Sequence, residues 1–257
     1  MSTLAESAYL LYPLAIGAAI LAGFINTLAG SGSLITLPVL IFLGLPPGVA
    51  NGTNRIGILI QSIVGVMRFR QSGKLEWHDG KFFVLPSTLG AIAGAFIAIG
   101  LDAEKMNMAI AAVMGVMLLL TIAQPEKWLR KKTELAAGYR SAGNFLIFFL
   151  IGVHGGFIQA GVGILMLIAM VLRCGFAVAN ANAVKLVLVL IFTVPAVAIF
   201  VIHDQVHWPL ALIMAGGQGA GAWLAAHFAS NSKNAALWTQ RLLIVIIIAS
   251  MGKLLTM

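Results

Sequence analysis

The sequence is poor in charge, poorest in acidic residues, and almost without cysteine. Only 9% of its 257 residues are charged and only eight are Asp or Glu, whereas 60% are hydrophobic and the mean hydropathy is +1.00. The single cysteine, Cys174, excludes an intrachain disulfide and a cysteine-built metal site. A composition this apolar excludes a soluble domain of this length and indicates an integral membrane protein.

The few acidic residues all lie near the N-terminus, in predicted loops or at predicted segment ends. A carboxylate relay of the kind typical of proton pumps is therefore not expected, and a cationic substrate would lack a counter-charge. The sequence also has no metal-ligand cluster and no phosphate-binding motif, so we expect neither a cofactor nor an enzymatic activity. The net charge of +8 is assigned to loop Lys and Arg that orient the chain in a bilayer, not to nucleic-acid binding.

Long apolar runs predict an all-α polytopic membrane protein with about ten transmembrane segments. The runs lie at about 8–28, 33–45, 52–67, 82–101, 106–123, 144–159, 162–173, 181–202, 208–229 and 237–255. Several are shorter than the ~20 residues of a straight spanning helix, so these are expected to be broken, tilted or re-entrant.

An internal repeat relates the first half of the chain to the second. Gly30 and Gly32, inside the run from Asn26 to Pro38, match Gly161 and Gly163, 131 positions later. The same offset relates Gly44, Ala50, Asn51 and Trp77 to Gly175, Ala181, Asn182 and Trp208. Because five segments per repeat is an odd number, two inverted halves are predicted, as in many secondary transporters.

The predicted halves are residues 1–124 and 144–257, joined by a basic cytoplasmic linker at 125–143. With both termini outside, the cytoplasmic loops carry Arg68, Arg70, Lys74, Lys81, Lys127, Arg130, Lys131, Lys132, Arg140, Arg173 and Lys233. The outer loops carry only Lys105 and Lys253. This positive-inside asymmetry favours the orientation with the N-terminus and C-terminus outside.

Glycine-rich breaks interrupt the apolar segments at matching places in the two halves. Such backbone survives at membrane depth only where it is buried in protein or lines a wet cavity, and paired breaks indicate a transporter's binding site. The candidate substrate-binding residues around the breaks are Gly30, Ser31, Gly32, Ser33, Thr53, Asn54, Arg55, Gln159, Gly161, Gly163, Asn182 and Lys185. Thr36 and Gln61 are further hydrogen-bond donors nearby.

Two cations, Arg55 and Lys185, lie at nearly equivalent positions of the repeat, each close to a break. Ionisable residues inside a membrane are costly, so the pair suggests a central anion site, with helix N-termini after the breaks directed inward. The alternative is that each cation reaches an interface or caps the C-terminus of a neighbouring helix. His154, beside the second break, is either a proton relay or a packing histidine.

The run from Gly23 to Pro38, GFINTLAGSGSLITLP, resembles the first signature of the TauE/SafE sulfite exporter family, and ANGTNR at 50–55 is similar to the element that follows it. The second-half runs at 160–163 and 181–185 are similar as well. Ser31 and Ser33 depart from common glycine positions of the family, and Val184 from a threonine. The resemblance implies transport of sulfite or related organic anions across a bacterial inner membrane.

Residues and resemblance together predict a secondary transporter that exports a small oxyanion, sulfite foremost, through the lipid bilayer by alternating access. A proton-coupled importer of a sulfonate or carboxylate, with His154 as relay, is one alternative. Another is a non-transporting membrane subunit that binds a partner through the loop at 124–143. The sequence leaves the direction, the coupling ion and a homo-oligomeric state open.

Overall fold

The computed structural model describes residues 2–73, 75–122 and 135–228. Within these ranges all regular structure is helical, as predicted. The elements are α1 (Ser2–Ala29), α2 (Ser33–Phe42), α3 (Pro47–Gln71), the short 3₁₀ turn η1 (Asp79–Phe83), α4 (Val84–Ile99), α5 (Ala103–Ile122), α7 (Ala142–Phe157), α8 (Val162–Ile168), the π-helical turn η2 (Ala169–Arg173), α9 (Val178–Ile202) and α10 (Trp208–Phe228). The predicted segment at 237–255 and most of the linker at 125–143 lie outside the described ranges.

Helix α3 differs most from its predicted bounds of 52–67. It begins at Pro47, which occupies the first helical position, and runs unbroken to Gln71. Proline is well tolerated there because the first helical N–H has no intrahelical partner. The polar run Asn51–Arg55, predicted to lie at the start of the segment, is therefore inside the helix, where all five side chains are buried.

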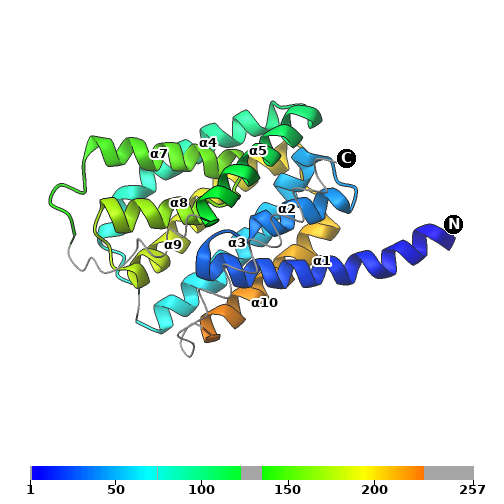
Figure 1. Cartoon of the computed structure of the whole chain (residues 1–257), viewed down its shortest axis with the longest axis horizontal. Coiled ribbons are helices and arrows are strands. Elements are labelled where there is room, and N and C mark those ends of the chain that lie inside the picture. Colours follow the sequence, from blue (N-terminus) through cyan, green and yellow to red (C-terminus); the bar gives the residue numbers. More distant parts are fainter. Residues whose placement is uncertain (1, 74, 123–134, 229–257) are drawn as a thin grey trace.

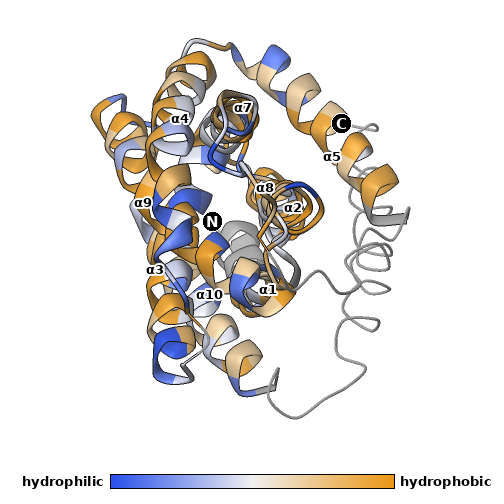
Figure 2. Cartoon of the chain, turned by 90° about the vertical axis from the view of Figure 1, so that its left-hand side faces the viewer, coloured by the Kyte–Doolittle hydropathy of each residue, from blue (hydrophilic) through white to orange (hydrophobic). Residues whose placement is uncertain are grey.

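All described helices except α5 form two layers, seen most clearly along the long axis in Figure 2, where α5 lies apart from both. Helices α4, α9, α3 and α10 form one row, and the contacts of α4 with α9, α9 with α3 and α3 with α10 hold it together. In the second layer α7 and α1 flank α8 and α2. Helices α8 and α2 lie at opposite sides of the centre in Figure 1 but overlap in Figure 2, so they are arranged end to end.

Small residues join the two layers at both edges. A Cβ on Gly94 of α4 would lie 2.0 Å from the carbonyl oxygen of Val153 in α7. A Cβ on Gly221 of α10 would lie 2.0 Å from the carbonyl oxygen of Ile20 in α1. Such close backbone approach is typical of small-residue contacts between membrane helices. The glycine runs at 90–94 and 217–221 therefore allow the helices to pack closely.

The backbone repeats with the same 131-residue offset as the sequence. Left-handed φ angles occur at Gly30 and Gly161 (81° and 75°) and at Gly44 and Gly175 (91° and 78°). A third pair is Gly73 (68°) and Asp204, the single non-glycine residue with positive φ in the part of the chain that the structure describes (55°). These angles recur at turns that the offset makes equivalent, and the inverted ten-segment arrangement itself stays a prediction.

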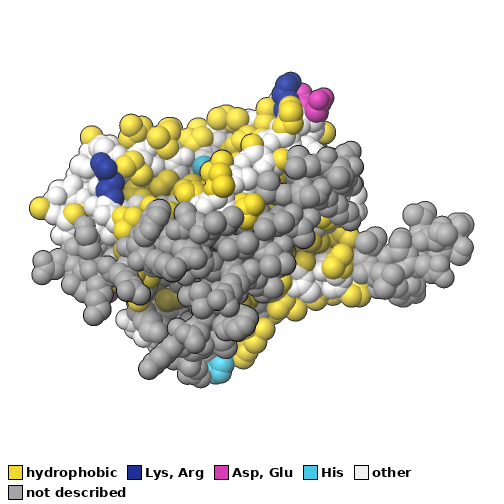
Figure 3. Space-filling model, viewed as in Figure 1, with side chains coloured by type: hydrophobic (Ala, Val, Ile, Leu, Met, Phe, Trp, Pro, Cys, Tyr) yellow, Lys and Arg dark blue, Asp and Glu magenta, His cyan; other side chains and the backbone are white. Residues whose placement is uncertain are grey.

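Many polar side chains are buried inside the molecule, and many large apolar side chains are exposed on its surface. Arg55, Asn54, Gln61 and Thr36 are fully buried, whereas Leu119 is 69% exposed. On the face drawn in Figure 3, hydrophobic side chains cover the described surface and the Lys, Arg, Asp and Glu side chains lie at its two ends. This distribution suits an apolar solvent. Among the residues that the structure describes, three helical stretches are long and apolar enough to cross a membrane, at Asp79–Ile99, Ala103–Leu120 and Val178–Ile202.

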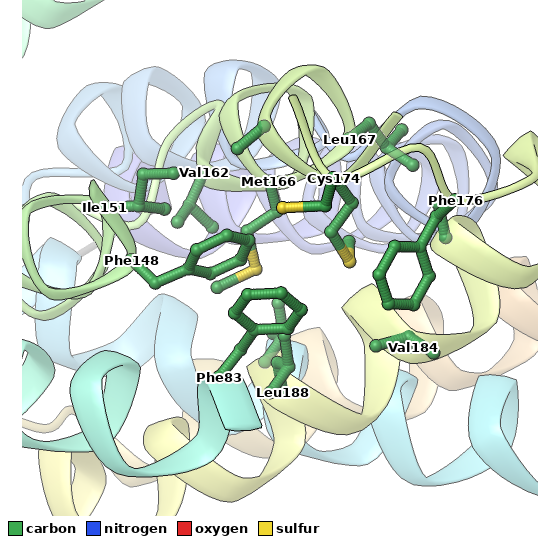
Figure 4. Close-up of a cluster of buried hydrophobic side chains, with 14 of the residues drawn as sticks. Phe83, Phe148, Ile151, Val162, Met166, Leu167, Cys174, Phe176, Val184 and Leu188 are labelled. Carbon is green, nitrogen blue, oxygen red and sulfur yellow. The ribbon is translucent and has the colours of Figure 1, made fainter. Parts of the chain in front are cut away.

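An aromatic cluster fixes one end of the two layers. Phe83 of η1 stacks on Phe148 of α7, with ring centroids 3.9 Å apart. Figure 4 shows these rings beside Met166 and Leu188, so the cluster joins η1 and α7 to α8 and α9. It packs elements of the predicted first half against elements of the predicted second half, and thereby positions the break between α7 and α8.

Candidate functional site

The two glycine-rich breaks meet at the centre of the molecule. Helix α1 ends at Ala29 and α2 begins at Ser33, whereas α7 ends at Phe157 and α8 begins at Val162. A Cβ on Gly30 would lie only 2.5 Å from the Cα of Gly163, so the two backbones are in direct contact. As predicted, the short helices after the breaks direct their N-termini inward.

Arg55 holds the end of the helix before the second break. It lies on α3 and is fully buried. Its guanidinium donates to the carbonyl oxygens of Gly156 (2.6 Å), Gly155 (3.0 Å) and Phe157 (3.2 Å), and to Oε1 of Gln159 (3.3 Å). Those carbonyls are among the last of α7, which have no intrahelical donor. Arg55 thus caps the C-terminus of α7, and the sequence had offered this arrangement as the alternative to direct anion binding.

Lys185 occupies the equivalent position at the end of the helix before the first break. It lies on α9 and its side chain is 1% exposed. Its Nζ donates to Oδ1 of Asn182 at 2.5 Å and to the carbonyl oxygen of Asn26 in α1 at 3.5 Å. No carboxylate contacts it within the described residues, where the ion pairs are Lys105–Asp102 and Arg140–Asp79.

An asparagine accompanies each cation. Asn182 Nδ2 donates to the carbonyl oxygen of Thr27 at 3.2 Å, near the end of α1. Asn51 Nδ2 donates to the carbonyl oxygen of Phe157 at 2.7 Å, at the end of α7. Each asparagine also accepts a hydrogen bond from the neighbouring cation. We call Asn51 with Arg55 and Asn182 with Lys185 the two clasps. Asn51 was missed as a site residue, although its repeat match to Asn182 was the signal that pointed to it.

A cavity of about 10 Å³ lies beside the contact of the two breaks. That is about the room that one water molecule needs. Of the predicted site residues, Gly30, Gln159, Gly163 and Lys185 line it. The remaining lining residues are the polar Asn26 and Gln61 and the apolar Ile58, Val162, Leu186 and Val189.

The side-chain oxygens on the cavity wall are already bonded. Oδ1 of Asn26 accepts from the Gly32 N–H at 3.3 Å, and Oε1 of Gln159 accepts from Arg55. Oε1 of Gln61 accepts from Nδ2 of Asn26 at 3.1 Å. By contrast Nε2 of Gln61, a fully buried donor, has no partner within the described residues. The donors left for an occupant are the Nε2 of Gln61 and the ammonium of Lys185.

Several predicted site residues lie outside the cavity. Thr53 Oγ1 accepts from the His207 N–H (2.9 Å), which ties α3 to the turn before α10. Asn54 Oδ1 accepts from Thr36 Oγ1 (2.6 Å) and from Gln218 Nε2 (3.2 Å). The remaining members, Ser31, Gly32, Ser33, Gly161 and Asn182, surround the two breaks without lining the cavity.

His154 lies in the last turn of α7 and is half-buried. Its Nε2 is 2.8 Å from the carbonyl oxygen of Ala160, directly before Gly161. The imidazole therefore spans the second break from its own helix. It does not line the cavity. A proton on this ring would act through the backbone of the break, not through direct contact with a bound anion.

A family model described as Sulfite exporter TauE/SafE matches residues 15–254 of the chain. The match includes both breaks and both clasps. No solved structure matches the chain.

Curated bacterial proteins are similar over most of their length. A Haemophilus influenzae protein named "Probable membrane transporter protein" is 28% identical over 208 residues, which cover 80% of each chain. "Probable membrane transporter protein YfcA" of Escherichia coli K12 is 25% identical over 84% of this chain and 81% of its own. A Sinorhizobium protein, "Probable membrane transporter protein ORF9", is 26% identical over 82% and 80%.

Proposed function

Because this chain belongs to the TauE/SafE sulfite exporter family, we propose that it moves a small oxyanion, sulfite or a related sulfur-containing organic anion, across a bacterial inner membrane. Membrane transport itself is the common property of the family and of the similar proteins. The anion and the direction are the proposal, and they follow from the chemistry of the central cavity.

The observation that carries the choice of an anion is the set of donors on the cavity wall. Lys185 is a buried ammonium group with no carboxylate partner within the described residues, and Gln61 adds an unpartnered amide N–H. Burying an uncompensated charge costs several kcal/mol. An anion between these groups offsets that cost and accepts both hydrogen bonds, whereas a cation would meet donors and a like charge.

Arg55 takes a different part in this proposal. Its guanidinium donates hydrogen bonds to the end of α7 and to Gln159. Arg55 therefore positions the wall of the site and adds positive charge without contacting the anion. Lys185 contacts the anion. Asn182 orients the Lys185 ammonium, and Gln159 lies between Arg55 and the cavity.

Alternating access follows from the two inverted halves, residues 1–124 and 144–257, which rock about the contact of the breaks. The cavity of about 10 Å³ is too small for a three-oxygen anion, so binding requires the breaks to separate on one side. Each clasp joins one half to the broken helix of the other, and opening one clasp at a time exposes the site to one side of the membrane.

Export is the direction that needs no coupling ion. Both termini are outside in this proposal. Where the potential is negative inside, moving one negative charge outward lowers its free energy by about 2.3 kcal/mol per 100 mV. A proton-coupled importer of a sulfonate or carboxylate is the second candidate, and the bond of His154 across the second break favours it.

Flux measurements in proteoliposomes test the proposal. Sulfite, sulfate, thiosulfate, a sulfonate and a carboxylate are offered in turn, with an imposed potential and with an imposed pH gradient. We expect saturable sulfite flux that follows the potential, is lost in Lys185→Met and is retained in the matched exposed variant Lys105→Met. Equal flux in the two variants contradicts the site, and flux that requires the pH gradient selects the importer.

A further inference from the structure

The central cavity combines a free donor on Gln61 and the buried ammonium of Lys185 with a volume of about 10 Å³. We propose that it is a halide site, filled by chloride when the breaks are in contact, in which Lys185 and Gln61 donate to the ion. This inference rests on the proposed anion site. It names the ion that the site holds while the cavity is too small for an oxyanion.

The first argument is the distribution of donors and acceptors. Nε2 of Gln61 and the ammonium of Lys185 offer hydrogens, while the side-chain oxygens of Asn26, Gln61 and Gln159 already accept from other groups. Each of these oxygens keeps a second lone pair that a water molecule can use, but a water molecule brings no negative charge to Lys185. A halide only accepts, so it satisfies Gln61 and Lys185 without bringing an unsatisfied donor of its own.

The second argument is charge. Lys185 is 1% exposed, and its Nζ donates to the neutral oxygens of Asn182 and Asn26. Apolar side chains, among them Ile58 and Val162, also line the cavity. A low-dielectric wall strengthens the attraction between an ammonium and an ion placed against it, and one negative charge compensates Lys185.

The third argument is size. About 10 Å³ of room is close to what one water molecule needs and is less than an anion with three oxygens needs. Chloride is a single atom and requires little widening of the cavity. Halide and oxyanion therefore share Lys185 but not the same arrangement of the breaks. External chloride should compete with the oxyanion and stabilise the arrangement in which Gly30 touches Gly163.

Chlorine NMR line width tests the proposal directly, because chloride that exchanges with a protein site relaxes faster than free chloride. The purified full chain in lipid nanodiscs, in gluconate buffer, is titrated with sodium chloride. We expect excess broadening that saturates and that bromide removes more effectively than iodide, since iodide is the larger ion. Lys185→Met should abolish the excess, whereas Lys105→Met should keep it.

Two substitutions of Gln61 sharpen the test without changing the size of the side chain much. Gln61→Met removes the free donor and should weaken chloride binding by about tenfold or more, the loss expected for one hydrogen bond to a charged group. Gln61→Glu supplies a carboxylate beside Lys185 and should displace the halide altogether. Wild-type broadening in Gln61→Glu or in Lys185→Met overturns the proposal, even if the variant is less stable.

The outcome is separable from the proposed transport. Sulfite flux without any chloride broadening that depends on Lys185 overturns the halide site and leaves the transport function standing. Broadening that depends on Lys185, in a protein that moves no oxyanion, supports the halide site and removes the transport function.

Discussion

The contact between the two breaks can be tested with a pair of glycines that share a backbone conformation but not an environment. Gly30 and Gly44 have φ angles of 81° and 91°. A Cβ on Gly44 would meet nothing within 4 Å, whereas a Cβ on Gly30 would lie 2.5 Å from Gly163 Cα. Substituting both by alanine therefore separates the cost of the left-handed conformation from the cost of forcing the breaks apart.

The expected magnitudes follow from those two terms. Gly44→Ala lowers the unfolding free energy only by the cost of a left-handed alanine, about 1–2 kcal/mol. Gly30→Ala adds overpacking of a close-packed backbone contact, about 1–3 kcal/mol more. We therefore expect losses of about 1–2 kcal/mol for Gly44→Ala and about 2–5 kcal/mol for Gly30→Ala.

Reversible unfolding in mixed micelles measures both losses, and anion flux in proteoliposomes measures the functional consequence. Gly30→Ala should abolish flux because its methyl group holds the breaks apart beside the cavity, and Gly44→Ala should retain it. Equal destabilisation of the two variants, with equal flux, would refute the argument that the breaks touch.

Three further predictions concern single side chains. Arg55→Met leaves two buried α7 carbonyls without their donor, and we expect unfolding in micelles to show a loss of about 2–6 kcal/mol. Gly156→Ala should destabilise the protein, since its Cβ would lie 1.9 Å from the Ala91 carbonyl oxygen. Gly216→Ala, whose Cβ would have nothing within 4 Å, should stabilise it by up to about 1 kcal/mol. A change of unfolding free energy with the same sign in both variants would contradict the helix contact. Burial, and then its hydrogen bond to Asp79, raise the pKa of Tyr139. The folded state therefore holds this proton longer than the unfolded chain, so stability should fall as pH rises above about 10, and Tyr139→Phe should remove that fall in pH-dependent unfolding.

Much of the fold follows from local signals. Apolar runs of limited length and glycines that permit positive φ act within a few residues, and together with the repeat offset they predicted the helices on both sides of Gly30 and Gly161. The offset even relates the left-handed pair Gly73 and Asp204, which no residue identity indicates. The start of α3 was misplaced because the polar run Asn51–Arg55 was taken for the beginning of a membrane segment. The run is instead buried within the helix.

The wall of the site could be predicted only in part, because it depends on how the halves dock. Arg55 bonds to carbonyls 100–102 positions away, and Lys185 to one 159 positions away. Backbone carbonyls carry no sequence signal, so the capping role of Arg55 was one of two open alternatives. Gln61 was named as a donor near the breaks but not as a site residue, since a glutamine in an apolar helix has the same sequence signature wherever its amide points.

The two clasps are equivalent in position but unequal in strength. At the end of α7, Arg55 and Asn51 place bonds of 2.6, 2.7 and 3.0 Å on consecutive carbonyls. At the end of α1, Asn182 makes one bond of 3.2 Å, and Lys185 reaches a carbonyl only at 3.5 Å. A hydrogen bond to a charged group contributes about 1.5–3 kcal/mol, so the α1 end should open first.

Hydrogen exchange of the folded protein in nanodiscs measures this inequality. One such bond corresponds to about tenfold or more in the opening equilibrium. After correction for intrinsic rates, amides at 28–34 should exchange at least about tenfold faster than amides at 158–164. Arg55→Lys shortens the side chain and replaces the two-armed guanidinium with a single ammonium. The amides of the two breaks should then exchange at more nearly equal rates. Equal protection in the wild type, or faster exchange at the second break, would show that the clasps do not set the order of opening.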